Sequence, residues 1–197
     1  MTRVSYGAAC DRLEELIRVE SSGMAHFYVA IDGPRGAGKT ALGEELARRL
    51  AGFVIHTDDF ALPARNLTPA RASLPGGAFD YERFTYEVAR PFLAKKLPAY
   101  GIYREEVRGT AGRVTVPECG VYLIEGCYAL HPEIPDFYDL RIVLHKDGEE
   151  DGDPVRTYLS AYLIEEFCDV IVSDDVDDEE PDGFAGFSLP LSLDGTN

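Results

Sequence analysis

The order of apolar and polar residues predicts an α/β fold in which short buried strands alternate with amphipathic helices. Runs dominated by apolar, β-branched or aromatic residues predict strands at 27–31, 53–56, 121–124, 140–144 and 170–172. Between the first two runs, Leu42, Leu46 and Leu50 recur every four residues among charged ones, which predicts a helix. Because strands that are joined through a helix are normally parallel, we expect a mostly parallel sheet flanked by helices.

Three more helices are expected. Residues 5–19 carry apolar residues at helical spacing, which predicts an N-terminal helix. A second helix should begin after Asp80, a residue type favoured at the N-cap, and Pro91 should kink it or loosen it locally. A third is expected from about Pro154.

Two segments are expected to lie outside the main sheet. Residues 61–79 are rich in Pro, Ala, Arg and Gly without a sustained period, which predicts a loop over the site. Within 95–117, residues 99–103 and 113–116 could pair as a hairpin whose turn includes Gly109.

Length and composition are those of one globular domain with a substantial core. The chain has 197 residues, of which 45% are hydrophobic and 27% are charged. No stretch approaches 18 consecutive apolar residues, and the first residues lack the apolar segment of a signal peptide, so we expect no membrane helix. The four cysteines are scattered without a C-x-x-C pair, which favours reduced thiols and a cytoplasmic location over disulfides or a metal cluster.

The formal net charge of −16 is unevenly distributed. Residues 174–197 contain eight acidic residues and no Lys or Arg, which accounts for half of the net charge. We therefore expect a folded domain over residues 1–173 and an acidic tail over 174–197. Nucleic acids and anionic membranes would repel a chain of this charge, so neither is expected as a partner.

A phosphate-binding loop is predicted at residues 33–40, which read Gly-Pro-Arg-Gly-Ala-Gly-Lys-Thr and match the spacing G-x-x-x-x-G-K-[ST]. The pattern is short enough to occur by chance, but the expected strand before it and the expected helix after it supply the required context. Glycines let successive backbone N–H groups point at one anion, and the helix N-terminus adds a partial positive charge. The sequence therefore predicts binding of a nucleoside triphosphate.

Within this loop, Lys39 is expected to reach the β- and γ-phosphates, and the Thr40 hydroxyl is expected to ligate Mg²⁺. A GTPase switch is disfavoured, because Asn66 and Asn197 are the only asparagines and leave no N-K-x-D motif. The candidate nucleotide-binding residues are Gly33, Pro34, Arg35, Gly36, Ala37, Gly38, Lys39, Thr40 and Ala41.

Acidic residues follow two of the predicted strands. Asp58 and Asp59 come after residues 53–56, and Glu125 comes after residues 121–124. The carboxyl ends of parallel strands share the edge at which ligands bind, so these residues should lie near the loop. A carboxylate there could hold Mg²⁺ or orient a hydroxyl, whereas Asp58 and Asp59 could also cap the next element or face solvent.

Further segments follow the loop in a fixed order: Thr-Asp-Asp-Phe (57–60), Pro-Gly-Gly-Ala-Phe-Asp-Tyr-Glu-Arg-Phe (75–84), Leu-Ile-Glu-Gly-Cys-Tyr-Ala-Leu-His-Pro-Glu (123–133), Phe-Tyr-Asp-Leu-Arg-Ile (137–142) and Cys-Asp-Val-Ile-Val (168–172). Together with the loop they resemble the bacterial uridine kinase-like branch of the phosphoribulokinase/uridine kinase family, over about residues 27–172. The resemblance implies a three-layer P-loop NTPase fold. It also implies transfer of the ATP γ-phosphoryl to a hydroxyl of a small molecule, with a uridine-like nucleoside as the first expectation.

The resemblance also assigns roles to single residues. Asp58 corresponds to the family's catalytic aspartate and Glu125 to its acid near Mg²⁺, so Asp58, Lys39 and Glu125 are the candidate catalytic residues. Thr40 and Glu125 are the candidate Mg²⁺ ligands. On the acceptor side, the family's Phe-Asp pair and its tyrosine have counterparts here, although Asp80 suits plain helix capping equally well. The candidate substrate-binding residues are Asp59, Phe79, Asp80, Tyr100, Tyr103 and Arg104.

One segment departs from the family's pattern. After the strand at 140–144 the family has an arginine-bearing helix and a lid, whereas residues 145–153 here are mostly acidic and leave Arg156 as the candidate replacement. Lid arginines stabilise developing phosphate charge, and lid closure excludes water. Three functions therefore stay open: a nucleoside kinase, a kinase for another acceptor such as pantothenate or a phosphorylated sugar, and a nucleotide-binding protein with weak or lost transfer. A homo-oligomer is compatible with each.

Overall fold

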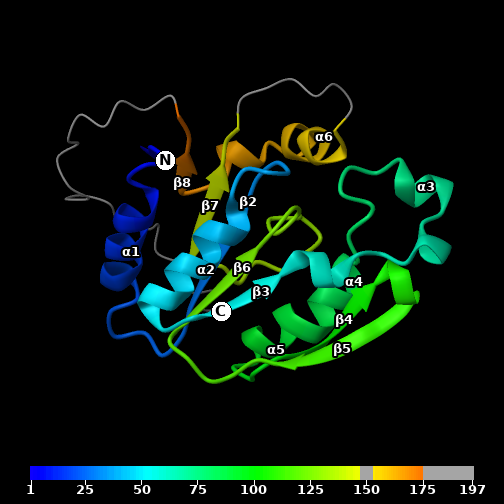
Figure 1. The fold of residues 1–197 in the computed structure, drawn as a ribbon, viewed down its shortest axis with the longest axis horizontal. Coiled ribbons are helices and arrows are strands. Elements are labelled where there is room, and N and C mark those ends of the chain that lie inside the picture. Colours follow the sequence, from blue (N-terminus) through cyan, green and yellow to red (C-terminus); the bar gives the residue numbers. More distant parts are fainter. Residues whose placement is uncertain (147–152, 175–197) are drawn as a thin grey trace, which may run out of the picture.

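A parallel β-sheet forms the centre of the computed structural model, which describes residues 1–146 and 153–174 (Figure 1). In this part of the chain the sheet has the order β1-β8-β7-β2-β6-β3, and every neighbouring pair is parallel. The strands are β1 (Thr2–Val4), β2 (Phe27–Asp32), β3 (Phe53–His56), β6 (Val121–Glu125), β7 (Leu140–Leu144) and β8 (Val170–Val172).

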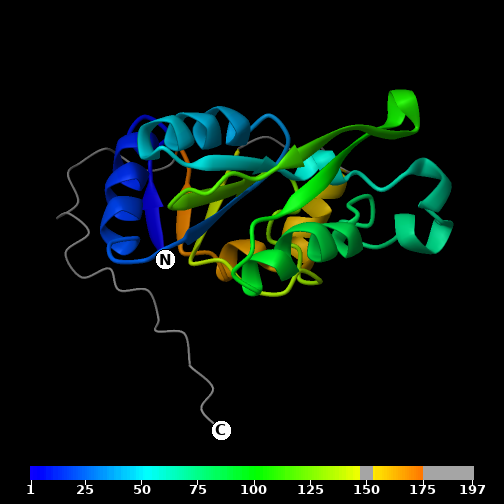
Figure 2. The same cartoon turned by 90° about the horizontal axis from the view of Figure 1, so that it is seen from below.

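Helices cover both faces of this sheet, so the molecule has three layers (Figure 2). Helices α1 (Ala9–Glu20) and α2 (Lys39–Leu50) pack on one face. The other face is covered by α4 (Tyr81–Phe84), α5 (Arg90–Leu93) and α6 (Pro154–Ala161). The predicted three-layer α/β fold with a mostly parallel sheet is confirmed.

Strand β2 shows how the sequence produces these layers. Successive side chains of a strand point to opposite faces. Phe27, Val29 and Ile31 accordingly join the core beneath α1 and α2, while Tyr28 and Ala30 join the core on the opposite face. A strand that is buried on both faces has no polar alternation, which is why it is a continuous apolar run in the sequence.

The N-terminal prediction needs a correction. The helix begins at Ala9 rather than at residue 5, and the residues before it form strand β1 at the sheet edge. Thr2 pairs with Val170 of β8, and the Ser5 hydroxyl accepts a hydrogen bond from the Ala8 N–H at 3.2 Å. Strand β8 thus supplies hydrogen-bond partners along one side of residues 2–4, and the helix starts after the turn that follows Ser5.

Residues 81–93 form one helical stretch that consists of α4, a π-helical turn (Thr85–Ala89) and α5. The Asp80 side chain accepts a hydrogen bond from the Arg83 N–H at 3.1 Å, so the predicted N-cap is confirmed. The wide turn lies directly before the turn that contains Pro91. Since proline lacks an N–H and displaces the preceding carbonyl, this widening is the local loosening that the sequence predicted.

The predicted hairpin is present as β4 (Ala99–Arg104) and β5 (Gly109–Thr115), with Tyr100 opposite Val114. The segment 61–79 is less irregular than expected, because it contains a short helical turn at Ala64–Asn66 and the helix α3 (Pro69–Ala72). The Arg65 guanidinium donates a hydrogen bond to the Arg108 carbonyl at 3.3 Å. This bond joins the segment to the hairpin.

Several predictions fall outside the described residues. The acidic stretch within 147–152 and the tail from residue 175 onward are among them, so the shortened lid, the acidic tail and the domain boundary at residue 173 stay predictions. No helix in the described ranges is long and apolar enough to span a bilayer.

Candidate active site

The glycine-rich loop lies between the end of β2 and the start of α2, as the motif requires (Figure 1). Gly36 and Gly38 have φ angles of 71° and 86°, in the left-handed region that favours glycine. At Gly33 a Cβ atom would lie 2.4 Å from the Leu144 carbonyl oxygen, so any larger residue would push the loop away from β7. The strand–loop–helix geometry that we predicted is therefore present.

Lys39 is buried and folds back over this loop. Its Nζ donates hydrogen bonds to the carbonyl oxygens of Gly33, at 2.9 Å, and Pro34, at 2.7 Å, and it lies 3.5 Å from the Cys127 Sγ. Burial raises the pKa of the Cys127 thiol, which favours the neutral form beside the ammonium group. A cation held at the loop is what an anionic phosphate would need.

Asp32 was not singled out in the sequence, although it supports the loop directly. It is completely buried, and its Oδ1 accepts hydrogen bonds from the N–H groups of Gly33, at 2.6 Å, and Tyr128, at 3.2 Å. Its Oδ2 accepts from the Leu130 N–H and the Tyr158 hydroxyl, both at 2.9 Å. Burial raises the pKa of Asp32, and these donated hydrogen bonds oppose that rise. One carboxylate thus connects the phosphate loop, the segment after β6 and helix α6.

Glu125 ends β6 and is almost completely buried beside α2. The Thr40 Oγ1 lies 3.2 Å from both of its carboxylate oxygens. On the other side, the His56 Nδ1 lies 2.5 Å from the Glu125 Oε1. This hydrogen bond raises the pKa of His56 above its usual value. The two predicted metal ligands are thus adjacent, and His56 is a neighbour that sequence reasoning missed.

The chemistry of this donor set fits Mg²⁺. A hydroxyl and a carboxylate are hard oxygen ligands, and Mg²⁺ is commonly bound by one or two carboxylates together with substrate phosphates. No group of three or more His, Cys, Asp or Glu side chains suited to a metal occurs within the described ranges. Thr40 and Glu125 would therefore hold Mg²⁺ together with nucleotide phosphates rather than in a cage of protein ligands.

Asp58 and Asp59 lie in the short helical turn Thr57–Phe60 that follows β3. Asp58 is exposed, whereas Asp59 is buried and forms an ion pair with Arg104 of β4, at 2.9 Å between Oδ1 and Nη1. The exposed Asp58 could meet an acceptor hydroxyl or simply face solvent, so both alternatives stay open for it. Asp59 instead pairs with the hairpin, which neither alternative foresaw.

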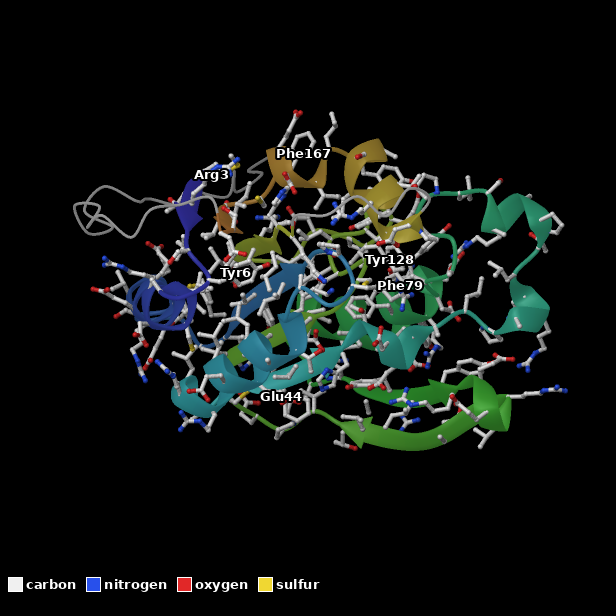
Figure 3. All side chains as sticks on the ribbon, turned by 45° about the horizontal axis from the view of Figure 1, so that its top comes forward. Arg3, Tyr6, Glu44, Phe79, Tyr128 and Phe167 are labelled. Carbon is white, nitrogen blue, oxygen red and sulfur yellow. The ribbon has the colours of Figure 1, made fainter. Side chains whose placement is uncertain are left out.

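The remaining acceptor-side candidates are mostly engaged in packing. Phe79 is buried against Phe84 and Tyr128, and Figure 3 shows Phe79 and Tyr128 side by side. Tyr100 is fully buried, with its ring centroid 5.0 Å from that of Phe60, and burial raises the pKa of its hydroxyl. The Tyr103 hydroxyl donates to Glu105. Contact of these residues with a substrate stays a prediction.

Two known proteins are similar to this chain in sequence or in fold. No family model matches the chain. Uridine-cytidine kinase C of Dictyostelium discoideum is 32% identical over 139 residues, which are 66% of this chain and 29% of that protein. A solved structure described as a possible uridine kinase from Bacillus stearothermophilus has a TM-score of 0.67 at 20% identity, and the match covers 83% of this chain and 98% of that one.

The chain is thus similar in sequence to a uridine-cytidine kinase and shares the fold of the solved structure. The resemblance predicted from the ordered motifs is therefore confirmed. The matched region spans only 29% of the length of the curated relative, so that protein's activity as a whole is not transferred with the similarity.

A cavity of about 330 Å³ opens beside the phosphate loop. Pro34 of the loop, Lys146 after β7 and Arg156 of α6 are among the residues that line it. The Lys146 Nζ lies 3.2 Å from the position that a Cβ on Gly36 would occupy, and Arg156 donates to the Lys146 carbonyl at 2.7 Å. Sequence reasoning named Arg156 but not Lys146, because this lysine belongs to a mostly acidic stretch.

A second unpredicted feature is a stack of rings around the buried His131. Its ring stacks with that of Tyr81, at 4.6 Å, and with that of Tyr158, at 5.7 Å between centroids. Burial lowers the pKa of His131 to about 4. Since Tyr158 also donates to Asp32, the stack supports α6 next to the phosphate loop.

Proposed function

We propose that this protein is an ATP-dependent kinase that transfers the γ-phosphoryl group to a hydroxyl of a small molecule, with a uridine-like nucleoside as the first candidate. The observation that carries the proposal is the adjacency of Thr40 and Glu125 at the start of α2, beside the phosphate loop and Lys39. The phosphate-binding loop, a cation and a metal site of hard oxygen ligands would then lie together at the carboxyl ends of the strands. The name of the curated relative, a uridine-cytidine kinase, supports phosphotransferase activity, and the solved structure of similar fold is described as a possible uridine kinase.

Each residue would have a defined part in the transfer. The backbone N–H groups of the loop and the Lys39 ammonium would bind the β- and γ-phosphates, which requires Lys39 to exchange its carbonyl partners for phosphate oxygens. Mg²⁺ held by Thr40 and Glu125 would neutralise charge on those phosphates. Asp58 would accept the proton of the acceptor hydroxyl. The hydroxyl oxygen would then bond to the γ-phosphorus while the bond between that phosphorus and the leaving ADP breaks.

Lys146 and Arg156 support transfer despite the short sequence after β7. Both line the cavity beside the loop, together with Glu165 and Glu166, and the Lys146 Nζ approaches Gly36. Lys146 would therefore supply positive charge to bound phosphates in place of the family's arginine-bearing helix. The same sequence departure favours the second candidate, a nucleotide-binding protein with weak or lost transfer, and pantothenate is an alternative acceptor.

The four free cysteines and the acidic chain are consistent with a cytoplasmic protein without nucleic-acid or membrane partners.

The test has two parts. Calorimetric titration with ATP should show binding to the wild type and little binding to Lys39→Ala, because a charge-assisted phosphate contact is lost. ADP release with Mg-ATP is then measured against uridine, cytidine, pantothenate and no acceptor. Acceptor-dependent release supports the kinase, whereas ATP binding without any such release favours the non-catalytic candidate. Undiminished binding to Lys39→Ala would refute the phosphate-loop function.

A further inference from the structure

His56 and Glu125 are brought together by the sheet itself. They are direct register partners on the parallel strands β3 and β6, both at the carboxyl ends of these strands. The distance from the His56 Nδ1 to the Glu125 Oε1 is 2.5 Å. An ionised carboxylate only accepts hydrogen bonds, so Nδ1 carries the hydrogen and donates it.

Glu125 is buried, and few groups around its carboxylate can donate hydrogen bonds to it. Its side chain is 4% exposed, and a Cβ added to Gly43 of α2 would lie 3.3 Å from its Cγ. A buried carboxylate is costly unless it receives hydrogen bonds. The described donors to it are His56 and the Thr40 hydroxyl, and Thr40 is also a candidate metal ligand.

His56 itself is not needed to fill the core. Its side chain is 36% exposed, at the end of β3 just before the turn Thr57–Phe60. Water can therefore replace the imidazole without creating an empty cavity. A residue of this kind acts through the orientation it imposes on its partner rather than through packing.

We infer that His56 is a positioning residue for the Mg²⁺ site: it fixes one oxygen of Glu125 through Nδ1–H and leaves the other oxygen directed for the metal. The inference rests on the proposed function, because it concerns the metal that accompanies ATP. Hydrogen-bond partners of metal ligands commonly change metal affinity by about 10- to 100-fold when they are removed. Loss of the His56 donor should therefore weaken the contribution of Mg²⁺ to nucleotide binding.

The experiment compares ATP affinity in Mg²⁺ and in EDTA by calorimetry, for the wild type and three variants. His56→Leu removes the donor. His56→Asn keeps an N–H at the same number of bonds from the backbone as Nδ1. His26→Leu is the matched control, since its Nε2 lies 2.6 Å from the Glu118 Oε1 at the opposite end of the strands.

The expected result is a specific loss of the Mg²⁺ effect. In His56→Leu the factor by which Mg²⁺ tightens ATP binding should fall about tenfold or more. Affinity in EDTA and the melting temperature should stay near the wild-type values. His56→Asn should recover most of the effect, and His26→Leu should retain all of it. In a Glu125→Gln background, His56→Leu should cause no further loss, because the two residues act through one contact.

Three outcomes in the variants would overturn the inference. They are a wild-type Mg²⁺ effect in His56→Leu, equal weakening of binding in Mg²⁺ and EDTA together with a lower melting temperature, and full additivity with Glu125→Gln. An absence of any Mg²⁺ effect in the wild type would overturn it as well. None of these touches the proposed nucleotide binding, which fails only if Lys39→Ala binds ATP normally.

Discussion

The stacked His131 predicts a defined loss of stability in acid. Its pKa in the folded protein is lowered to about 4 by burial, whereas a histidine in the unfolded chain titrates near 6.5. Between these two pKa values His131 is therefore protonated in the unfolded chain but neutral in the folded protein. The stabilisation is complete above the unfolded pKa and is lost as the pH falls from about 6.5 towards about 4.

The magnitude follows from these two pKa values. The free energy of unfolding should decrease by about 1 kcal/mol between about pH 7.5 and 5.5, and by about 3 kcal/mol once the folded-state group is protonated. Other groups titrate in the same range, and His56 acts in the opposite direction because its pKa is raised in the folded protein. The contribution of His131 must therefore be isolated by comparison with a variant.

His131→Phe isolates it, because phenylalanine keeps a ring between Tyr81 and Tyr158 but does not titrate. Urea denaturation of the wild type and the variant at both pH values gives the difference in unfolding free energy at each pH. That difference should shift by about 1 kcal/mol in favour of the variant at the lower pH. His131→Asn also lacks a titrating ring. Its difference from the wild type should shift by the same amount between the two pH values, even if this variant is less stable than His131→Phe at both. If the unfolding free energies of the wild type and both variants change equally between the two pH values, His131 is not held neutral by burial.

Three further predictions follow from the site. Asp58→Asn should leave ATP binding nearly intact and lower transfer by about two to four orders of magnitude, the usual worth of a general base; near-wild-type turnover would move that role elsewhere. Asp32→Asn should lower the unfolding free energy by about 1–3 kcal/mol, since the amide NH₂ replaces one carboxylate oxygen and leaves the buried N–H group of Gly33 or of Leu130 without its acceptor; a change below about 0.5 kcal/mol would contradict the contacts of Asp32. Lys146→Ala should weaken ATP binding about 10-fold or more, as expected for a charge-assisted contact, whereas exposed Lys96→Ala should not; equal affinities would remove Lys146 from the site.

The sequence predicts those parts of the fold that depend on local pattern. The two-sided burial of β2 requires a continuous apolar run, and the run is present. Asp80 is an N-cap because its side chain reaches the Arg83 N–H three residues on, which is a property of four residues alone. The glycines of the phosphate loop are fixed by local backbone angles in the same way.

The parts that were missed depend on partners far away in the chain. Strand β1 has only three residues, two of them polar, and exists because β8 supplies its hydrogen bonds 168 residues later, with Thr2 opposite Val170. His56 gains its role only because β6 lies next to β3 in the sheet order, which places Glu125 opposite it. Asp32 precedes the motif by one residue, and nothing local reveals that donors after residue 125 converge on it.

The most direct measurement is mass-spectrometric detection of a phosphorylated nucleoside formed from uridine and Mg-ATP. A uridine kinase-like phosphotransferase should form uridine monophosphate and ADP in equal amounts with the wild type. It should form neither with Lys39→Ala, and product formation should be strongly reduced with Asp58→Asn although that variant still binds ATP. ATP binding with no phosphorylated product from uridine or any other acceptor would contradict kinase activity and leave a nucleotide-binding protein.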